Sequence, residues 1–224
     1  MIYITMFKNV NKIIHIIMNK VLRKLHLMGK RFATSEEIKI YCKEYGMSYY
    51  NTVRNLISAG YLVRIFRGIF YVKDFNEVKL GRLNTSHLEL IAKGIEIKGI
   101  KNWYYGLYTA LKLNNVTHEY FSIDYVINDR IFRYKPIDIA GYKIKFVKLK
   151  GELTRFGITG DTYRYSDLEK TILDMIYLWR YNGKPREKII TDISDYADNI
   201  STTRLRKYLS HYPKTVKDIV EEII

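Results

Sequence analysis

The sequence predicts an α+β protein with two domains, residues 1–80 and 81–224. Three patterns support this prediction. Residues 34–72 show two short runs with helical apolar spacing and then a β-hairpin pattern. Apolar and polar residues alternate through much of 120–165, as in β-strands, and the last quarter returns to helical spacing. We therefore expect a mixed α+β second domain that ends in a helical bundle, and 224 residues are enough for two modest cores.

The first expected helix covers Val10–Leu27, where apolar residues recur at helical spacing and basic residues occupy other positions. Such a helix can close the core of a small three-helix domain. The alternative is a helix that lies on a membrane surface, basic on one side and apolar on the other. We favour the core helix because the elements that follow need a third helix to bury their apolar faces.

A capping box marks the next helix, since Thr34 is followed three residues later by Glu37. The helix should begin at Ser35 and stop at Gly46, which can adopt the left-handed conformation of a helix end. Cys42, the single cysteine, falls on its apolar stripe, so we expect a buried structural thiol. The full stripe is Ile38, Tyr41, Cys42 and Tyr45.

Ser48 is expected to cap a second helix that ends at Gly60. No carboxylate occurs from residue 47 to residue 73, which suits a helix in a DNA major groove because Asp and Glu would be repelled by phosphate. The expected buried stripe is Tyr49, Val53, Leu56 and Ile57; the expected outward residues are Ser48, Asn51, Thr52 and Asn55, flanked by Tyr50, Arg54 and Ser58.

A hairpin follows, with strands Tyr61–Ile65 and Ile69–Val72 around a tip at Phe66–Gly68. Two helices and then a hairpin is the order of a winged helix-turn-helix, with the hairpin as the wing. Arg64 and Arg67 lie at or near its tip, where they can contact phosphates or a narrow minor groove. The candidate DNA-binding residues are Ser48, Tyr49, Tyr50, Asn51, Thr52, Arg54, Asn55, Arg64, Arg67 and Gly68, with Lys30 and Arg31 as further candidates for backbone contact. The alternative is a unit that binds protein.

The net charge of +15 is unevenly distributed. Residues 1–80 hold 14 Lys and Arg against 5 Asp and Glu, whereas residues 81–224 hold 24 against 18. Such an excess attracts a polyanion, although an anionic membrane would serve equally well on charge alone. No apolar run approaches the length of a membrane span, so we expect a cytoplasmic protein without a membrane segment.

Asp74–Asn84 mixes charges with few apolar residues and is expected to be the linker between the domains. His87–Ile97 and Trp103–Leu113 then have helical spacing, and Asn114-Asn115 is a turn signal. The expected strands are Tyr120–Ile127, Ile131–Tyr134, Ile137–Ile139, Tyr142–Leu149 and Leu153–Ile158.

In the strand at Tyr142–Phe146, Lys143 and Lys145 share one face. They could form a second nucleic-acid surface or simply solvate an exposed sheet edge.

The final helices have clear start signals, which are a second capping box at Ser166 and Glu169, Pro185, Ser201 and Pro213.

Three segments together resemble the AbiEi family of antitoxins of type IV toxin-antitoxin systems. They are YLVRIFRGIFYV at Tyr61–Val72, KNWYYGLYTALKLNN at Lys101–Asn115 and YSDLEKTILDMIYLW at Tyr165–Trp179. The resemblance implies a repressor of its own operon that binds inverted repeats in double-stranded promoter DNA, with two protomers able to meet on the DNA. It also implies a C-terminal antitoxin domain, residues 81–224, that counteracts a nucleotidyltransferase-like toxin without a stable complex. Only the outward face of the second helix and the wing carry over residue by residue, at Ser48, Asn51, Thr52, Arg54, Asn55, Arg64 and Arg67.

An enzyme is the opposing class. The five histidines are scattered and do not supply a metal set with Cys42, and no phosphate-binding or nucleophile-elbow motif occurs. Asp138 followed by Lys143 and Lys145 resembles part of a nuclease motif, but the second carboxylate is missing. We therefore expect no catalysis, no metal and no cofactor. A free-standing winged-helix regulator with a ligand- or partner-sensing C-terminal domain remains the alternative, and a toxin-like reading frame downstream would decide against it.

Overall fold

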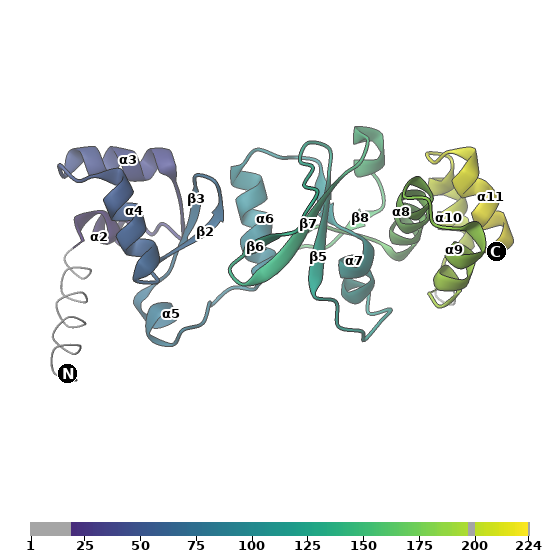
Figure 1. Ribbon diagram of the computed structural model, residues 1–224, viewed down its shortest axis with the longest axis horizontal. Helices are drawn as coiled ribbons and strands as arrows, with labels where there is room; N and C mark the ends of the chain where they lie inside the picture. Colours follow the sequence, from purple (N-terminus) through teal and green to yellow (C-terminus); the bar gives the residue numbers. More distant parts are fainter. Residues whose placement is uncertain (1–18, 197–199, 224) are drawn as a thin grey trace. The chain divides into compact units, whose positions relative to one another are not determined.

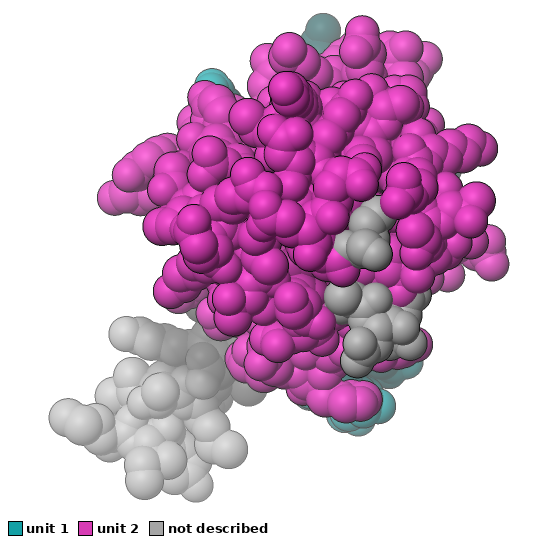
Figure 2. Space-filling model, turned by 90° about the vertical axis from the view of Figure 1, so that its right-hand side faces the viewer, with its two compact units in different colours: residues 1–98 teal, residues 99–224 magenta. Residues whose placement is uncertain are grey.

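The structure, a computed structural model, describes residues 19–196 and 200–223. Its contacts divide the chain into two compact units, residues 1–98 and 99–224. Figure 1 labels most helices and strands of both units, and Figure 2 shows the surface of the second unit in magenta. The mixed α+β fold class is confirmed.

The first unit has the element order of a winged helix-turn-helix, as predicted. A helix, a short strand, two further helices and a hairpin follow one another, and the three strands form one sheet in the order β1-β3-β2 (Figure 1). The elements are α2 Lys20–Leu27, β1 Phe32–Thr34, α3 Ser35–Glu44, α4 Tyr49–Ser58, β2 Leu62–Phe66, β3 Ile69–Val72, α5 Phe75–Lys79 and α6 His87–Ile97. The beginning of the expected helix Val10–Leu27 lies outside the described residues.

The local signals around α3 and α4 are largely confirmed. Thr34 and Glu37 form the capping box, α3 begins at Ser35, and Gly46 has φ +64°. Ser48 occupies the N-cap position of α4, but its side chain makes no capping hydrogen bond. The predicted cap is therefore right in position and wrong in mechanism.

The strand β1 was not predicted. A three-residue strand is too short to show an alternating pattern in the sequence. β3 supplies the pairing, because Phe32 lies opposite Tyr71 and Thr34 opposite Ile69 in an antiparallel ladder.

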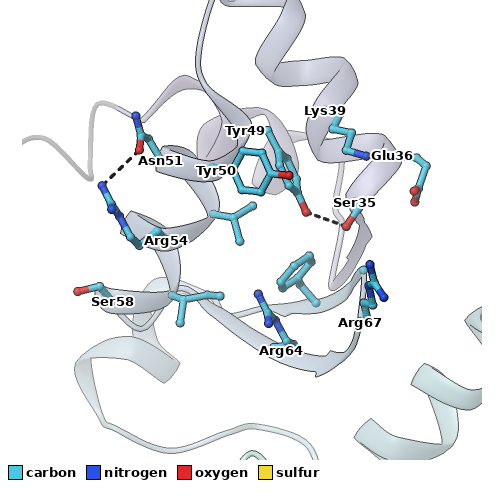
Figure 3. Close-up of a pocket in the computed structure, with 14 residues that line it drawn as sticks. Ser35, Glu36, Lys39, Tyr49, Tyr50, Asn51, Arg54, Ser58, Arg64 and Arg67 are labelled. Atoms are coloured by element: carbon cyan, nitrogen blue, oxygen red, sulfur yellow. Dashed lines mark hydrogen bonds between the residues drawn. The ribbon is translucent and has the colours of Figure 1, made fainter.

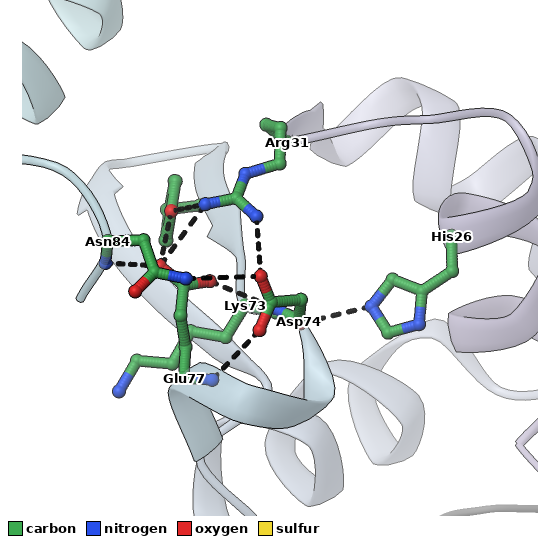
Figure 4. Close-up of polar contacts among 7 residues, drawn as sticks. His26, Arg31, Lys73, Asp74, Glu77 and Asn84 are labelled. Atoms are coloured by element: carbon green, nitrogen blue, oxygen red, sulfur yellow. Dashed lines mark hydrogen bonds and ion pairs between the residues drawn. The ribbon is translucent and has the colours of Figure 1, made fainter. Parts of the chain in front are cut away.

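The expected linker Asp74–Asn84 is a folded part of the first unit. Asp74 and Glu77 form a capping box that starts α5. Glu77 is fully buried and accepts hydrogen bonds from the backbone N–H of Asn84, at 2.7 Å, and from the hydroxyl of Tyr71, at 2.7 Å (Figure 4). The mixed charges of this segment suggested a linker, whereas the carboxylates of Asp74 and Glu77 serve as hydrogen-bond acceptors within the first unit.

The first unit extends beyond the predicted boundary at residue 80, because it includes α6. This helix has the bounds that its spacing predicted, His87–Ile97, but it packs against β2 and β3. Gly94 allows the close approach: a Cβ atom there would lie 2.6 Å from Ile65 and 2.9 Å from Phe66. The division between the units therefore falls between Lys98 and Gly99.

One apolar cluster joins α2, α3, α4 and the sheet. Its helices contribute apolar residues at the predicted spacing, and Cys42 is buried within it, as expected. The buried members are Val21, Leu22, Leu25, Ala33, Ile38, Cys42, Val53, Leu56, Tyr61, Leu62, Phe70 and Val72.

The second unit contains a six-stranded mixed sheet in the order β6-β7-β5-β4-β9-β8. Its helix α8 contacts α7, α9, α10 and α11 and forms the centre of the helical end of the chain (Figure 1). The strands are β4 Trp103–Tyr105, β5 Ile123–Asn128, β6 Ile137–Ile139, β7 Tyr142–Lys148, β8 Ile158–Thr159 and β9 Tyr165–Ser166. The helices are α7 Leu107–Leu113, the 3₁₀ turn η1 Gly151–Thr154, α8 Leu168–Tyr181, α9 Arg186–Ser194, α10 Thr202–Leu209 and α11 Lys214–Ile223.

The expected helix Trp103–Leu113 is wrong in its first half. Trp103–Tyr105 is a buried strand that pairs with β5 on one side and β9 on the other, which suits three aromatic residues in succession. Gly106 separates this strand from α7, and a Cβ atom there would lie 2.5 Å from the side chain of Ile127. The turn at Asn114-Asn115 is confirmed, since Asn115 has φ +57°.

Three other expectations in this unit need correction. Ile131–Tyr134 is not a strand, and Leu153–Ile158 begins in η1. The N-cap of α8 is Asp167, not Ser166, because the Asp167 carboxylate accepts from the Lys170 backbone N–H at 2.9 Å. Glu169, the expected partner in the capping box, instead accepts from the backbone N–H of Ser201 at 2.8 Å.

A buried polar cluster lies on the inner face of α8, and the sequence patterns did not predict it. The Lys170 Nζ donates to Asp174 at 2.5 Å, to the hydroxyl of Tyr212 at 2.9 Å and to that of Tyr104 at 3.0 Å. Both tyrosine hydroxyls donate in turn to the Asp174 carboxylate at 2.7 Å. Burial lowers the pKa of Lys170, and Asp174 opposes that shift. The cluster is satisfied internally, so we assign it a structural role.

Candidate nucleic-acid interface

A groove of about 1020 Å³ runs between the start of α3, the exposed face of α4 and the wing β2–β3. Figure 3 shows polar side chains from all three elements around the groove. The lining residues are Ser35, Glu36, Lys39, Tyr49, Tyr50, Asn51, Val53, Arg54, Ile57, Ser58, Arg64, Arg67, Gly68 and Phe70.

The exposed face of α4 carries amide, guanidinium and aromatic groups. Tyr50 is 82% exposed, and Asn51, Arg54 and Asn55 are also exposed. Arg54 donates to the side-chain oxygen of Asn51 at 3.2 Å, so this pair already holds a shared orientation (Figure 3). Asn55 and Ser48 are exposed but do not line the groove.

Tyr49 joins the two helices of the helix-turn-helix. Its hydroxyl and that of Ser35 lie 2.7 Å apart, and the Lys39 Nζ lies 5.4 Å from the centre of its ring. The Tyr49 and Tyr50 rings meet edge to face at 5.4 Å. Tyr49 therefore positions α4, while Tyr50 remains available to a ligand.

Arg64 and Arg67 are exposed on the wing, on the groove side (Figure 3). The Arg64 guanidinium lies 5.7 Å from the ring centre of Phe70, and the strand register shifts between Arg64 and Phe66. Within the described part of the chain, neither arginine forms an ion pair. Both cations are therefore free to meet phosphate.

One predicted contact residue, Thr52, has a structural role instead, and another, Gly68, lines the groove while it also shapes the wing. Thr52 is only 2% exposed, because this position of α4 faces the core side of the helix. Gly68 turns the wing with φ +80°, and its carbonyl accepts from the Ser35 backbone N–H at 2.8 Å. Ile57, conversely, was expected to be buried but is 36% exposed and lines the groove.

Lys30 and Arg31 are committed to carboxylates within the protein. Lys30 pairs with Glu37 at 2.7 Å. Arg31 pairs with Asp74 at 2.9 Å and with Glu77 at 3.2 Å (Figure 4). Burial alone would raise the pKa of Glu37, but the hydrogen bond from Lys30 and the capping bonds at Thr34 lower it. The charges of Lys30 and Arg31 are therefore compensated within the protein, which argues against a leading role for these two residues in phosphate contact.

The sequence did not identify several groove residues as DNA-contact candidates, because these residues belong to α3 and the prediction considered α4 and the wing. Ile38 is on the expected apolar stripe, and Lys39 is the next residue along the helix. Its helical position therefore places Lys39 off the buried face. Ser35 and Glu36 lie in the first turn of α3. The groove is lined by four cations, Lys39, Arg54, Arg64 and Arg67, against one carboxylate, Glu36. This balance attracts a polyanion.

The described residues contain no group of three or more His, Cys, Asp and Glu side chains that could hold a metal ion. Among the helices in that part of the chain, none combines the length and apolar character needed to cross a bilayer.

Comparison with known proteins agrees with this geometry. The family described as "Transcriptional regulator, AbiEi antitoxin" matches residues 20–73, from the start of α2 to just beyond β3. Residues 20–73 match the AbiEi antitoxin family. The predicted resemblance is thus confirmed for the winged part of the chain. No curated protein matches the chain.

The crystal structure of the RV2827C protein from Mycobacterium tuberculosis has a similar fold. It matches with a TM-score of 0.57 over 91% of this chain and 74% of that chain, at 14% sequence identity. At this identity the likeness concerns the fold. The structural likeness covers 91% of this chain, whereas the family match covers only residues 20–73, so the similar fold extends beyond the winged part.

Proposed function

We propose that the protein is a cytoplasmic repressor that binds duplex DNA in its own promoter through the groove of the AbiEi domain. The convergence of exposed Asn51 and Arg54 on α4 with Arg64 and Arg67 on the wing carries this proposal. In a major groove, Asn pairs with adenine and Arg with guanine, and apolar groups contact the thymine methyl. Tyr50 and Ile57 supply such apolar surface next to the polar groups.

The wing would hold the protein on the duplex. Arg64 and Arg67 lie on the side of the groove opposite α4, where they would contact phosphates or the adjoining minor groove. Lys39 would reach the backbone from α3. Inverted repeats would take two protomers, one for each half-site, and these can meet on the DNA.

The decisive measurement is anisotropy of labelled promoter duplex and of unrelated duplex across a salt series. We expect tighter binding to the promoter and a steep loss of affinity with salt. Removing two phosphate contacts with Arg64→Ala and Arg67→Ala should lower the slope of log K against log salt by about 1.8. Lys207→Ala with Lys214→Ala, on exposed helical positions of the second unit, is the matched control. Unchanged affinity in a folded Arg64→Ala, Arg67→Ala protein would refute the wing assignment.

We further propose that the second unit counteracts a nucleotidyltransferase-like toxin without forming a stable complex. The match of residues 20–73 to an antitoxin family supports this. The test expresses the downstream reading frame from an unrelated promoter, where repression cannot help, and asks whether the full chain restores growth. Rescue by the Arg64→Ala, Arg67→Ala protein supports separate antitoxin action. Lack of any toxic downstream product would instead favour a free-standing regulator with a sensing domain.

A further inference from the structure

The strand β7 of the second unit presents lysines next to aromatic side chains. Lys143 and Lys145 share one face of β7, while Ile144 and Phe146 are buried on the other. β7 pairs in parallel with β5, so that Lys145 lies beside Tyr125. Because β7 also pairs with β6, it is an inner strand, and its lysines do not protect a sheet edge as one interpretation of the sequence had suggested.

The segment between β5 and β6 places a further aromatic ring next to these lysines. Tyr134 is 80% exposed, and the Lys145 Nζ lies 5.6 Å from its ring centre while donating to its backbone carbonyl. The Arg133 backbone N–H donates to the carbonyl of Phe146 at 3.4 Å, which ties the segment to β7. Basic and aromatic residues alternate here as Arg130-Ile131-Phe132-Arg133-Tyr134-Lys135.

Buried Asn128 holds this segment in place. Its side-chain nitrogen donates to the carbonyls of Ile131, at 3.0 Å, and Val147, at 3.2 Å. Its side-chain oxygen accepts from the backbone N–H of Arg130 at 2.9 Å and from that of Ile131 at 2.5 Å. The exposed groups that follow are therefore carried on a fixed support, which lowers the entropy cost of binding.

The charge of the surface identifies its ligand as an anion. Residues 130–150 hold seven Lys and Arg and one carboxylate, Asp138. Asp138 lies opposite Lys143 in the ladder and accepts from the Gly141 backbone N–H at 3.0 Å, so it offsets part of this charge. An exposed ring among cations is typical of surfaces on which an unstacked base lies while its phosphates meet lysines. Paired bases in a duplex cannot use such a ring.

We propose that Tyr134, Lys143 and Lys145 form a binding surface for single-stranded nucleic acid, separate from the winged groove. One base stacks on the Tyr134 ring. The adjoining phosphates contact Lys143 and Lys145 on β7. Arg133 adds a further cation next to Tyr134 on the tethered segment. RNA and DNA share this chemistry, and the experiment distinguishes them.

The test uses the full chain carrying Arg64→Ala and Arg67→Ala, so that the winged groove contributes less. Labelled 12-nucleotide oligo-U, oligo-dT and a 12-base-pair duplex are titrated by anisotropy. We expect either single strand to bind more tightly than the duplex, and the tighter of the two names the natural class. Tyr134→Ala should weaken binding about 5- to 150-fold, whereas Tyr134→Phe, which keeps the ring, should stay within about 2-fold. Lys143→Ala with Lys145→Ala should lower the salt slope by about 1.4.

Matched controls come from the same unit. Tyr181 is 81% exposed, and Lys207 and Lys214 are exposed lysines on other helices. Binding that falls equally with Tyr181→Ala, or with Lys207→Ala and Lys214→Ala, would overturn the proposal. Tighter binding to the duplex than to either single strand would also overturn it. So would a Tyr134→Ala protein that binds both single strands normally and loses affinity only for phosphatidylserine vesicles, which are titrated in parallel. Circular dichroism melts of each variant confirm that it is folded.

Discussion

The hydroxyls of Tyr49 and Ser35 lie 2.7 Å apart and join the first turns of α3 and α4. The backbone N–H of Ser35 also donates to the carbonyl of Gly68 at the turn of the wing, at 2.8 Å. Ser35 thus connects all three sides of the groove through one side-chain and one backbone hydrogen bond. The relative position of α4 and the wing, and so the spacing of any DNA contacts, depends on this junction.

Tyr49→Phe should loosen that junction without removing the ring. Loss of one hydrogen bond should lower the free energy of unfolding by about 0.5–1.5 kcal/mol. Affinity for promoter duplex should fall as well, because α4 is less firmly positioned. Denaturant melts and anisotropy measure the two effects. Tyr50→Phe is the control, since Tyr50 is exposed, and equal stability losses in both variants would contradict the role given to Tyr49.

Asn51→Ala should relax sequence preference more than it reduces general affinity, and Asn55→Ala should have a smaller effect of the same kind because Asn55 lies outside the groove. Each base contact that is lost should cost about 1–3 kcal/mol at one base pair. Asn51→Ala should have the larger effect, because Asn51 also accepts from Arg54. Binding to a set of duplexes with single base-pair changes measures this. A uniform loss across the whole set would show that these residues contact only the backbone.

A fragment of residues 1–98 should be more stable than one of residues 1–80. Both contain the winged elements, but only the longer one keeps α6 over Ile65, Phe66 and Ile69 on the wing strands. Exposing even one such side chain costs about 1.5–3 kcal/mol. Urea melts should therefore show a higher midpoint for the longer fragment. Equal midpoints would mean that α6 adds nothing to the first unit.

Asp174→Ala should strongly destabilise the second unit. It leaves the buried Lys170 ammonium without its carboxylate, and breaking a buried ion pair in this way costs about 3–5 kcal/mol. Replacing both partners, as Lys170→Met with Asp174→Leu, should recover part of the loss because no buried charge remains. Thermal melts of the single and double variants test this. A double variant less stable than Asp174→Ala would contradict the explanation.

The first unit should lose stability in acid through Glu77. Burial alone would raise the pKa of Glu77, but hydrogen bonds from Asn84 and Tyr71 and the charge of Arg31 lower it. Because the folded-state pKa lies below the unfolded value of about 4.3, the stabilisation is complete above that pH and disappears as pH falls through the lowered pKa. Glu77→Gln should reduce stability at pH 7 and flatten the acid limb of a stability–pH profile. An unchanged acid limb would exclude Glu77 as its source.

The sequence signals whose predictions the structure confirms involve residues close together in the chain. The capping box of Thr34 and Glu37, the left-handed Gly46 and the apolar spacing of His87–Ile97 each involve residues within a few turns of one helix. Backbone geometry and hydrogen bonding over such short distances follow from residue type. The order of the winged elements, and with it the DNA-binding hypothesis, could therefore be predicted from the sequence.

Only the tertiary structure decided what depends on partners distant in the chain. Trp103–Tyr105 is a strand because β5 and β9 lie on either side, and α6 belongs to the first unit because β2 and β3 accept it. Thr52 is polar by type but buried by the direction in which α4 packs. The spacing of Lys170 and Asp174 suits any surface helix, and only the approach of Tyr104 and Tyr212 turns this pair into a buried cluster. Sequence patterns record a residue's neighbours along the chain, whereas burial and charge compensation depend on its neighbours in space.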